Sequence, residues 1–427
     1  MARSVRSALG CLLAGALVLG IATRGSAENW PGWRGPRGDG TSAEAHLPTH
    51  WSGSENVLWK TEIPGKGHAS PIVWEDRIFV ATCLEAEQSR LLLCYDLTGK
   101  ELWRREVLKA PLEHKHSLNS FASSTPVTDG KLVYVTFLSV KTADNGRDPG
   151  AGEMVVAAYD YSGAQKWLVR PGRFSSVHGY CSSPVLFEDK VIVNGDHDGD
   201  SYLVALSRTT GDTIWKVNRA NKTRSYSTPL IRDVAGRTQM VLCGSKCVTS
   251  FDPRTGKTWW TVQGPTEQFV ASMVFNGEYF FLTAGFPEHH AMAIRPDGDG
   301  DVTKTHVAWW VKKDASCGYV PSPIICGEYF LIACDTGICT CYEAHSGERV
   351  WKERLGPHYS ASLTTAEGLV YFLADDGVTK VIKPGKTLEV VAENKLGESC
   401  YASPAISAGR IYLRGEKHLF CIGAASN

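Results

Sequence analysis

A short turn followed by a tryptophan, four residues after the turn's glycine, recurs along this chain of 427 residues. Five copies are tight, and a sixth is stretched by a loop of alternating aspartate and glycine before Trp309 and Trp310. Equal units must stack on one another to bury their apolar faces, so the repeat indicates a ring or an array. The tight copies pair Gly99 with Trp103, Gly163 with Trp167, Gly211 with Trp215, Gly256 with Trp260, and Gly347 with Trp351.

A second landmark, a serine or threonine followed by proline, stands at the front of each repeat. Two further copies are degenerate and fall at the expected places, Met273-Val274 and Ser362-Leu363. Most spacings between fronts are roughly 40–50 residues, which is typical of four-stranded propeller blades. The intact copies are Ser70-Pro71, Thr125-Pro126, Ser183-Pro184, Thr228-Pro229, Ser322-Pro323 and Ser403-Pro404.

Each repeat contains short runs of β-branched and aromatic residues between turns rich in glycine and aspartate, as at 184–187, 191–193, 202–206 and 213–217. Such runs are typical of antiparallel strands, and the chain beyond its N-terminal leader lacks sustained helical periodicity. The sequence therefore predicts an all-β chain, a single eight-bladed β-propeller of four-stranded antiparallel blades. Seven blades is the alternative, if the degenerate seventh unit is absorbed by its neighbours.

The two ends of the repeat array complement each other. The last unit, at 405–422, has three strand-like runs and no tryptophan strand, whereas residues 57–60 form an orphan run that contains Trp59. Pairing this N-terminal strand with the last three would complete the eighth blade. We expect this closure because a closed ring leaves no exposed sheet edge.

Residues 1–27 have the pattern of a secretory signal peptide, with Arg3 and Arg6 before an apolar run and a small-residue cleavage site at 25–27. We expect export to the periplasm or the extracellular space. The run is short for a membrane span, and no later segment is long and apolar enough to be one. The expected organisation is a signal peptide at 1–27, an arm rich in Gly, Pro and Trp at 28–50, and a propeller at 51–427. We expect a monomer.

The charge balance excludes one class of function, and the cysteine positions indicate how the thiols are used. The chain has 45 basic and 45 acidic residues, so it lacks the basic surface of a nucleic-acid-binding protein. Three of its cysteines, Cys94, Cys341 and Cys421, occupy a position that is alanine or serine in other repeats. Such a position is typical of inward packing, so we expect mostly free, structural cysteines. The pairs most favourable for a disulfide are Cys83–Cys94 and Cys243–Cys247.

The loops that lead into the first strand of each blade, here called the leading loops, converge on a propeller's channel because the first strands line it. In this chain they are polar and aromatic, and four of them carry histidine, which turn formation does not require. Loops between second and third strands share this face and add residues such as Asp196, His197 and Asp335. We interpret the face as a ligand site. The candidates are His68, His116, Asn119, His178, Tyr180, Arg224, Tyr226, Gln268, Tyr319, His358, Tyr359 and Tyr401.

One acidic loop resembles the start of a calcium loop. Asp297, Asp299 and Asp301 stand at alternate positions, but Ala308 occupies the twelfth position, where an EF-hand needs glutamate. We interpret the loop as a long turn, with weak metal-binding potential in its three carboxylates.

The complete repeat, a third strand ending in Tyr-Asp and then Thr-Gly-x-x-x-Trp, resembles the tryptophan-docking motif of the pyrroloquinoline quinone (PQQ)-like propellers. The best copies are 158–167 and 250–260, and the resemblance covers residues 51–427. The arm is similar to the start of exported members in planctomycete-type bacteria. The resemblance implies that each tryptophan docks between neighbouring blades. The structural tryptophans are then Trp59, Trp103, Trp167, Trp215, Trp260, Trp310 and Trp351.

Two functions follow from the resemblance. The first is a non-catalytic binding or scaffold module, distantly similar to the propeller of the outer-membrane β-barrel assembly machinery, for a cell-envelope protein, peptide or polysaccharide. The second is a PQQ- or metal-dependent oxidoreductase with PQQ or calcium at the channel. Quinoprotein dehydrogenases of this superfamily carry a vicinal Cys-Cys disulfide, and this chain has no adjacent cysteine pair. The first function is therefore favoured.

Overall fold

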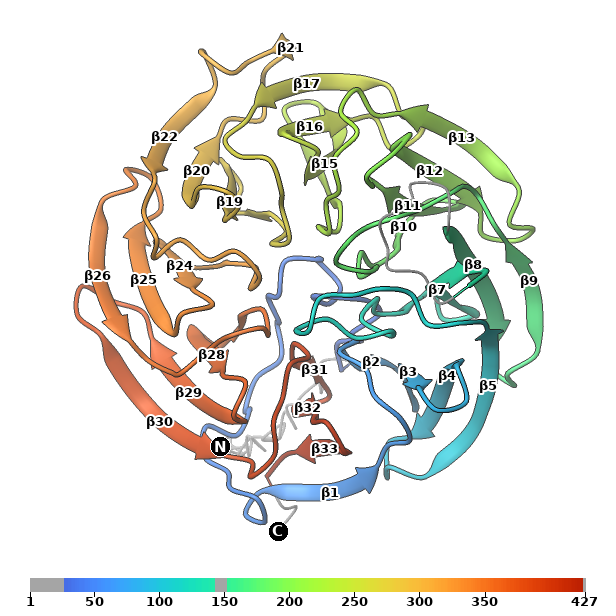
Figure 1. Ribbon diagram of the computed structural model, residues 1–427. Coiled ribbons are helices and arrows are strands. Elements are labelled where there is room, and N and C mark those ends of the chain that lie inside the picture. Colours follow the sequence, from blue (N-terminus) through green and yellow to red (C-terminus); the bar gives the residue numbers. More distant parts are fainter. Residues whose placement is uncertain (1–26, 143–151, 425–427) are drawn as a thin grey trace, which may run out of the picture.

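The computed structural model describes residues 27–142 and 152–424, and this part of the chain is built of strands and loops with no helix. Its strands form eight antiparallel sheets that surround a central axis as propeller blades (Figure 1). The predicted eight-bladed propeller is confirmed, and the seven-bladed alternative is wrong because the degenerate seventh unit forms a sheet of its own. The signal peptide predicted at 1–27 lies almost wholly outside the described residues and stays a prediction.

Within a blade the strands follow the sequence from the axis outward. Blade one comprises β2 (Ile72–Trp74), β3 (Arg77–Leu84), β4 (Ser89–Asp96) and β5 (Glu101–Lys109). Blade two comprises β6 (Val127–Thr128), β7 (Leu132–Val140), β8 (Gly152–Asp160) and β9 (Gln165–Val169). Blade three comprises β10 (Val185–Phe187), β11 (Lys190–Gly195), β12 (Tyr202–Ser207) and β13 (Thr213–Asn218). Blade four comprises β14 (Leu230–Val234), β15 (Arg237–Gly244), β16 (Cys247–Phe251) and β17 (Thr258–Gln263).

The second half of the ring repeats this order. Blade five comprises β18 (Val274–Phe275), β19 (Phe280–Ala284), β20 (His290–Ile294) and β22 (Val307–Lys312). Blade six comprises β23 (Ile324–Cys326), β24 (Tyr329–Ala333), β25 (Ile338–Glu343) and β26 (Arg349–Arg354). Blade seven comprises β27 (Thr364–Ala366), β28 (Leu369–Leu373), β29 (Val378–Lys383) and β30 (Glu389–Lys395). Blade eight comprises β31 (Ala405–Ser407), β32 (Arg410–Arg414), β33 (His418–Ile422) and the N-terminal β1 (Val57–Glu62).

Two features of the sheets bear on the predictions. The N-terminal β1 pairs antiparallel with β33, so the predicted closure is confirmed (Figure 1). Blade four departs from four strands because β21 (Gly300–Asp301), from the stretched turn, adds in parallel to β17. This long acidic turn therefore extends the neighbouring blade instead of folding back on its own.

The repeated tryptophans lie in the seams between blades. The indole N–H of Trp59, on β1, donates to the carbonyl of Leu97 in the turn of blade one at 2.8 Å. Trp309 makes the same contact with Ala344 in blade six at 2.8 Å. A buried aromatic with one N–H to satisfy suits such a seam. The other seam bonds of this kind run from Trp103 to Tyr161, from Trp167 to Arg208, and from Trp215 to Pro253.

The seam tryptophan of blade five is Trp309, so the prediction of Trp310 is wrong. Trp309 pairs with Ala293, the same register that pairs Trp215 with Ala205 in blade three. Adjacent strand residues face opposite sides, so Trp310 turns to the other face and its indole N–H lies 3.3 Å from His290 Nδ1 of its own blade. Trp260 keeps the seam register but donates to a side chain of its own blade.

In the repeats of this chain, the turn glycine stands at a constant distance from the tryptophan because the tryptophan of the preceding blade packs against that glycine. Gly347 has φ +73°, and a Cβ there would lie 2.5 Å from the ring of Trp309. Gly368 has φ +75°, but no atom lies within 4 Å of the Cβ position. We expect Gly368→Ala to cost the backbone strain alone, about 1–2 kcal/mol, and Gly347→Ala to cost about 2 kcal/mol more through overpacking. Equal shifts of the denaturation midpoint for both variants would contradict this account of the seam.

The serine and threonine of the repeat fronts form a ring of hydrogen bonds around the channel. Each backbone N–H donates to the side-chain oxygen of the equivalent residue in the next blade, at 2.7–3.2 Å in seven seams. The member from blade five is Ser272, so the front predicted at Met273 is shifted by one residue. The ring runs through Ser70, Thr125, Ser183, Thr228, Ser272, Ser322, Ser362 and Ser403.

The arm at 28–50 crosses the ring on the axis side of the blades (Figure 1). Trp30 bridges to Val73 of blade one, and Thr41 bridges in parallel to Thr365 of blade seven. Arg34 is 1% exposed and donates to the carbonyls of Pro323 at 2.7 Å, Leu363 at 3.3 Å, and Asp39. The arm is thus part of the folded ring and not a separate extension.

Candidate functional site: a chamber in the central channel

A cavity of about 440 Å³ lies in the channel, at the face that carries the leading loops. All eight leading loops contribute to its lining, and the arm adds Trp33. We call this cavity the chamber. Seven of the twelve candidate residues line it: His68, His116, Asn119, His178, Tyr226, Tyr319 and Tyr401.

Five candidates lie elsewhere because the local geometry of their loops directs the side chains away from the cavity. Tyr180 and Tyr359 are 4% and 0% exposed and pack in hydrophobic clusters between blades. Gln268 is buried and accepts a hydrogen bond from the Tyr319 hydroxyl at 3.3 Å. Sequence reasoning gave the correct loops but not the direction of each side chain.

The remaining two candidates are held by acidic loops at the same face. Arg224 donates to Asp198 at 2.6 Å, and His358 Nδ1 lies 2.6 Å from a carboxylate oxygen of Asp375. Each pair joins a leading loop to a loop between second and third strands, as the predicted shared face requires. Both pairs brace loops beside the chamber instead of lining it.

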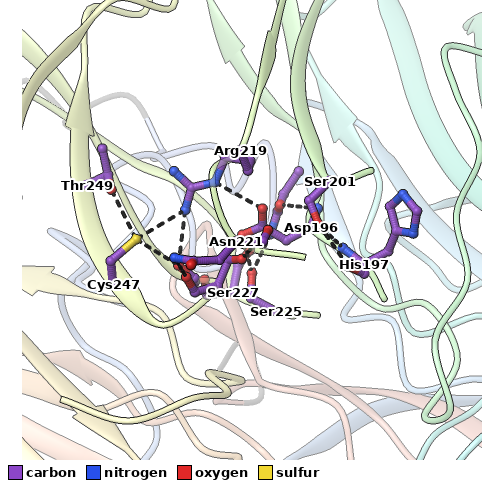
Figure 2. Close-up of polar contacts among 12 residues, drawn as sticks. Asp196, His197, Ser201, Arg219, Asn221, Ser225, Ser227, Cys247 and Thr249 are labelled. Carbon is purple, nitrogen blue, oxygen red and sulfur yellow. Dashed lines mark hydrogen bonds and ion pairs between the residues drawn. The ribbon is translucent and has the colours of Figure 1, made fainter. Parts of the chain in front are cut away.

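Asp196 belongs to the seam between blades three and four instead of the chamber (Figure 2). It is buried, and its carboxylate accepts hydrogen bonds from Arg219 Nε at 3.0 Å and from Ser225 Oγ at 2.9 Å. Arg219 also donates to the carbonyl of Gly244 at 3.0 Å. The ring of the adjacent His197 points away from this network (Figure 2). This acid therefore stabilises the ring and is not available to a chamber ligand.

Aromatic and imidazole rings meet in the chamber wall. The ring centres of His68 and Tyr401, from blades one and eight, are 4.6 Å apart. The His116 and His178 rings meet edge to face at 5.5 Å, and His178 lies 6.0 Å from Tyr226. The wall thus presents ring faces and edges from neighbouring blades.

Two of the chamber histidines, His68 and His178, are neutral at physiological pH. Burial, together with the nearby cations Arg414 and Lys115, lowers the pKa of His68 from 6.5 to about 3. Burial and the positive charge of Arg224 lower the pKa of His178 to about 4. Neutral imidazole offers one N–H donor and one acceptor nitrogen. These two rings therefore offer hydrogen bonds without a positive charge.

The lowered pKa of His68 predicts an acid-sensitive fold. Below pH 6.5 the unfolded chain binds this proton more readily than the folded chain, so stability falls as the pH drops toward the folded-state pKa. We expect a loss of at most about 1.4 kcal/mol per pH unit from this group. His68→Gln should flatten the dependence of the melting temperature on pH between 6.5 and 4, whereas His50→Gln, at an exposed position, should not. Equal slopes for wild type and His68→Gln would contradict the prediction.

Sequence reasoning did not assign several lining residues to the site, and four of them are Trp33, Leu118, Phe286 and Cys181. Trp33 comes from the arm, and only the three-dimensional path of the arm brings it to the channel. Leu118 and Phe286, 44% and 48% exposed, stand at the chamber's opening. Cys181 also lines the chamber, and burial raises the pKa of its thiol to about 12.

The described residues contain no group of three or more potential metal ligands close enough to hold an ion. The carboxylates of the acidic turn accept hydrogen bonds from within the turn. Asp301 accepts from the backbone N–H and the hydroxyl of Thr303 at 3.0 and 2.6 Å. Asp299 accepts from Gly300 N–H at 3.1 Å, and Asp297 lies 3.5 Å from His306. This supports the interpretation of the loop as a long turn.

All twelve cysteines of the described part are free, as predicted, and nearly all are buried. In the β3–β4 pair, Cys83 lies opposite Arg90 and Cys94 lies opposite Phe79. The two cysteines are therefore separated by four residue positions along the strands. Cys243 and Cys247 sit diagonally across a tight hairpin, where alternation directs them to opposite faces. Neither geometry allows a disulfide.

Comparisons with known proteins support the fold. No curated protein sequence matches the chain. A family model described as outer membrane protein assembly factor BamB matches residues 88–281. The crystal structure of BamB from Moraxella catarrhalis is similar, with a TM-score of 0.59 and 12% identity over 87% of this chain and 98% of that one. The chain has the PQQ-like propeller fold.

Dehydrogenases are also among the known structures that are similar to this chain. The quinohemoprotein alcohol dehydrogenase of Comamonas testosteroni is similar with a TM-score of 0.66 and 11% identity, over 93% of this chain and 81% of that one. A quinohemoprotein alcohol dehydrogenase of Pseudomonas putida HK5 gives 0.63 and 11%, over 94% and 81%. Since one fold serves an assembly factor and dehydrogenases, the function must be argued from the site.

Within the described residues, no helix is long and apolar enough to cross a bilayer.

Proposed function

We propose that this chain is a non-catalytic binding module of the cell envelope and that the chamber is its binding site. The observation that carries the proposal is the convergence of all eight leading loops on one cavity of about 440 Å³. A concave site of this size, lined by apolar surface with a few convergent polar groups, is typical of ligand binding. The expected signal peptide supports export, and the similarity to BamB supports a role in the envelope.

The chamber's opening supports binding of a partner or ligand. Six large apolar side chains of the described part are markedly exposed. Four of them, Leu58, Leu102, Ile214 and Val390, lie on outer strands, one to a blade. The other two, Leu118 and Phe286, both line the chamber. Exposed apolar side chains that gather at one opening favour an interaction site over scattered surface variation.

The lining does not fit PQQ. This quinone carries three carboxylates, so a site for it needs positive charge and, in the dehydrogenases, calcium. Among the described residues, those that line the chamber include no lysine or arginine, and Asp335 is their one acidic side chain. The pKa values of His68 and His178 leave both rings uncharged at neutral pH. The oxidoreductase alternative therefore rests on the fold alone.

The proposal is tested by filling the chamber. The full chain, purified from a bacterial envelope fraction, should carry a non-covalent ligand that native mass spectrometry detects. Val270→Trp places a large ring in the chamber and should abolish this ligand, while Leu58→Trp, on the outer strand β1, should retain it. A wild-type protein without ligand, or a ligand retained by the filled variant, would contradict the proposal.

A further inference from the structure

The arm contributes one aromatic ring, that of Trp33, to the lining of the chamber, and we call this ring the floor. Trp33 is half-buried and lines the chamber, and the next residue, Arg34, fastens the arm to carbonyls of blades six and seven. The guanidinium carbon of Arg34 lies 5.8 Å from the centre of the Trp33 ring. Because the adjacent residue is anchored, the indole offers a flat face at a defined place in the chamber, on which a ligand can stack.

The hydroxyl ring adds unused donors to the lining of the same chamber. Ser183, Thr228, Ser362 and Ser403 line the chamber, and each oxygen accepts one N–H from the preceding blade. Their own O–H groups have no acceptor within the described part of the chain. A hydroxyl offers one donor and two acceptor positions, so each retains a donor and an acceptor position for a ligand.

The remaining polar groups are also suited to an uncharged ligand. The imidazoles of His68 and His178 are neutral, for the reasons given above. Asp335 accepts the backbone N–H of Val320 at 2.9 Å through one carboxylate oxygen, and burial raises its pKa. In the described part of the chain, no lysine or arginine lines the chamber; the cations that act on His68 and His178, namely Lys115, Arg224 and Arg414, lie outside the lining.

We infer that the chamber binds a neutral saccharide, with one pyranose ring stacked on Trp33. A pyranose has an apolar C–H face for the indole and hydroxyls around its edge that both donate and accept. Those hydroxyls match the wall, in which Ser183, Thr228, Ser362 and Ser403 each retain a donor and an acceptor position. A purely apolar ligand would leave these groups unpaired in a buried site, which is costly. The inference rests on the proposed function and names its ligand class.

The experiment is saturation-transfer NMR, followed by calorimetry, on the full chain. The probes are glucose, galactose, N-acetylglucosamine and their β-1,4-linked disaccharides, with PQQ as the charged comparison. We expect transfer to the pyranose C–H protons of at least one saccharide, with a Kd of about 1 mM or tighter for a ligand of this size. PQQ should bind more weakly than that saccharide.

Two variants of the floor separate stacking from folding. Trp33→Ala should weaken the saccharide about tenfold, and Trp33→Phe, which keeps an aromatic face, should stay within about threefold of wild type. Leu102→Ala, at an exposed position on β5, should leave binding unchanged and serves as the matched control. The melting temperature of each variant verifies that the ring is folded.

The outcomes are distinct. No transfer from any saccharide, equal affinity of wild type and folded Trp33→Ala, or tighter binding of PQQ would each overturn the saccharide inference. A non-saccharide ligand found by native mass spectrometry would overturn it while the binding function stands. Failure to recover any ligand would remove the binding function itself.

Discussion

Trp59→Ala should lower the free energy of unfolding by about 3 kcal/mol, because it loosens the strand that closes the ring. Trp59 lies on β1, which completes blade eight by pairing with β33. Its indole donates to the carbonyl of Leu97, and its ring packs 6.2 Å from Tyr412. The loss should appear in the denaturation midpoint. It should also appear as concentration-dependent self-association, since a detached β1 leaves β33 as an exposed edge.

Leu58→Ala is the matched control for this prediction. Leu58 is the preceding residue on the same strand and is 37% exposed, on the opposite side from the seam. We expect its effect to stay within about 0.5 kcal/mol. Similar losses for the two variants would mean that β1 is stabilised by its general strand character and not by the docked tryptophan.

The repeat made the fold predictable because one contact is used again in most seams. A tryptophan on the outer strand rests on the turn glycine of the next blade, so the spacing along the chain reflects the geometry between blades. The prediction was wrong where two tryptophans are adjacent, because strand alternation decides between Trp309 and Trp310. The stretched turn before them hid the register that would have settled the choice.

The site was predictable to the level of loops. The leading loops had to converge, and all eight of them do. Whether a side chain such as Tyr180 or Tyr226 enters the channel depends on local loop geometry, which no periodicity records. Trp33 could not be assigned to the site at all, since its place depends on a path across three or more blades that is fixed by buried contacts of Arg34.

That dependence makes Arg34 the second position where a large effect is expected. Arg34→Met removes a buried guanidinium that donates to the carbonyls of Pro323, Leu363 and Asp39. All three contacts converge on Nη2, which has two N–H groups, so about two buried acceptors would lose a donor, and each such loss costs about 1–3 kcal/mol. Burial of the charged guanidinium is itself unfavourable, since it lowers the pKa of Arg34 to about 10. Removing that charge offsets part of the free energy lost with the hydrogen bonds. We therefore expect a net loss of about 3 kcal/mol in the free energy of unfolding.

Arg37→Met tests the same chemistry three residues away. The Arg37 side chain is 40% exposed, and its ion pair with Glu28 at 2.7 Å should contribute at most about 1 kcal/mol.

Denaturation midpoints compare the stabilities of the two variants, and limited trypsin digestion with mass spectrometry shows whether the arm at 28–50 is released. Only Arg34→Met should expose the arm to cleavage at native conditions, because it alone breaks the contacts to blades six and seven. Equal stability and equal protection in the two variants would show that the arm is held by its backbone bridges to Val73 and Thr365, and the fixed floor of the chamber would then not depend on Arg34.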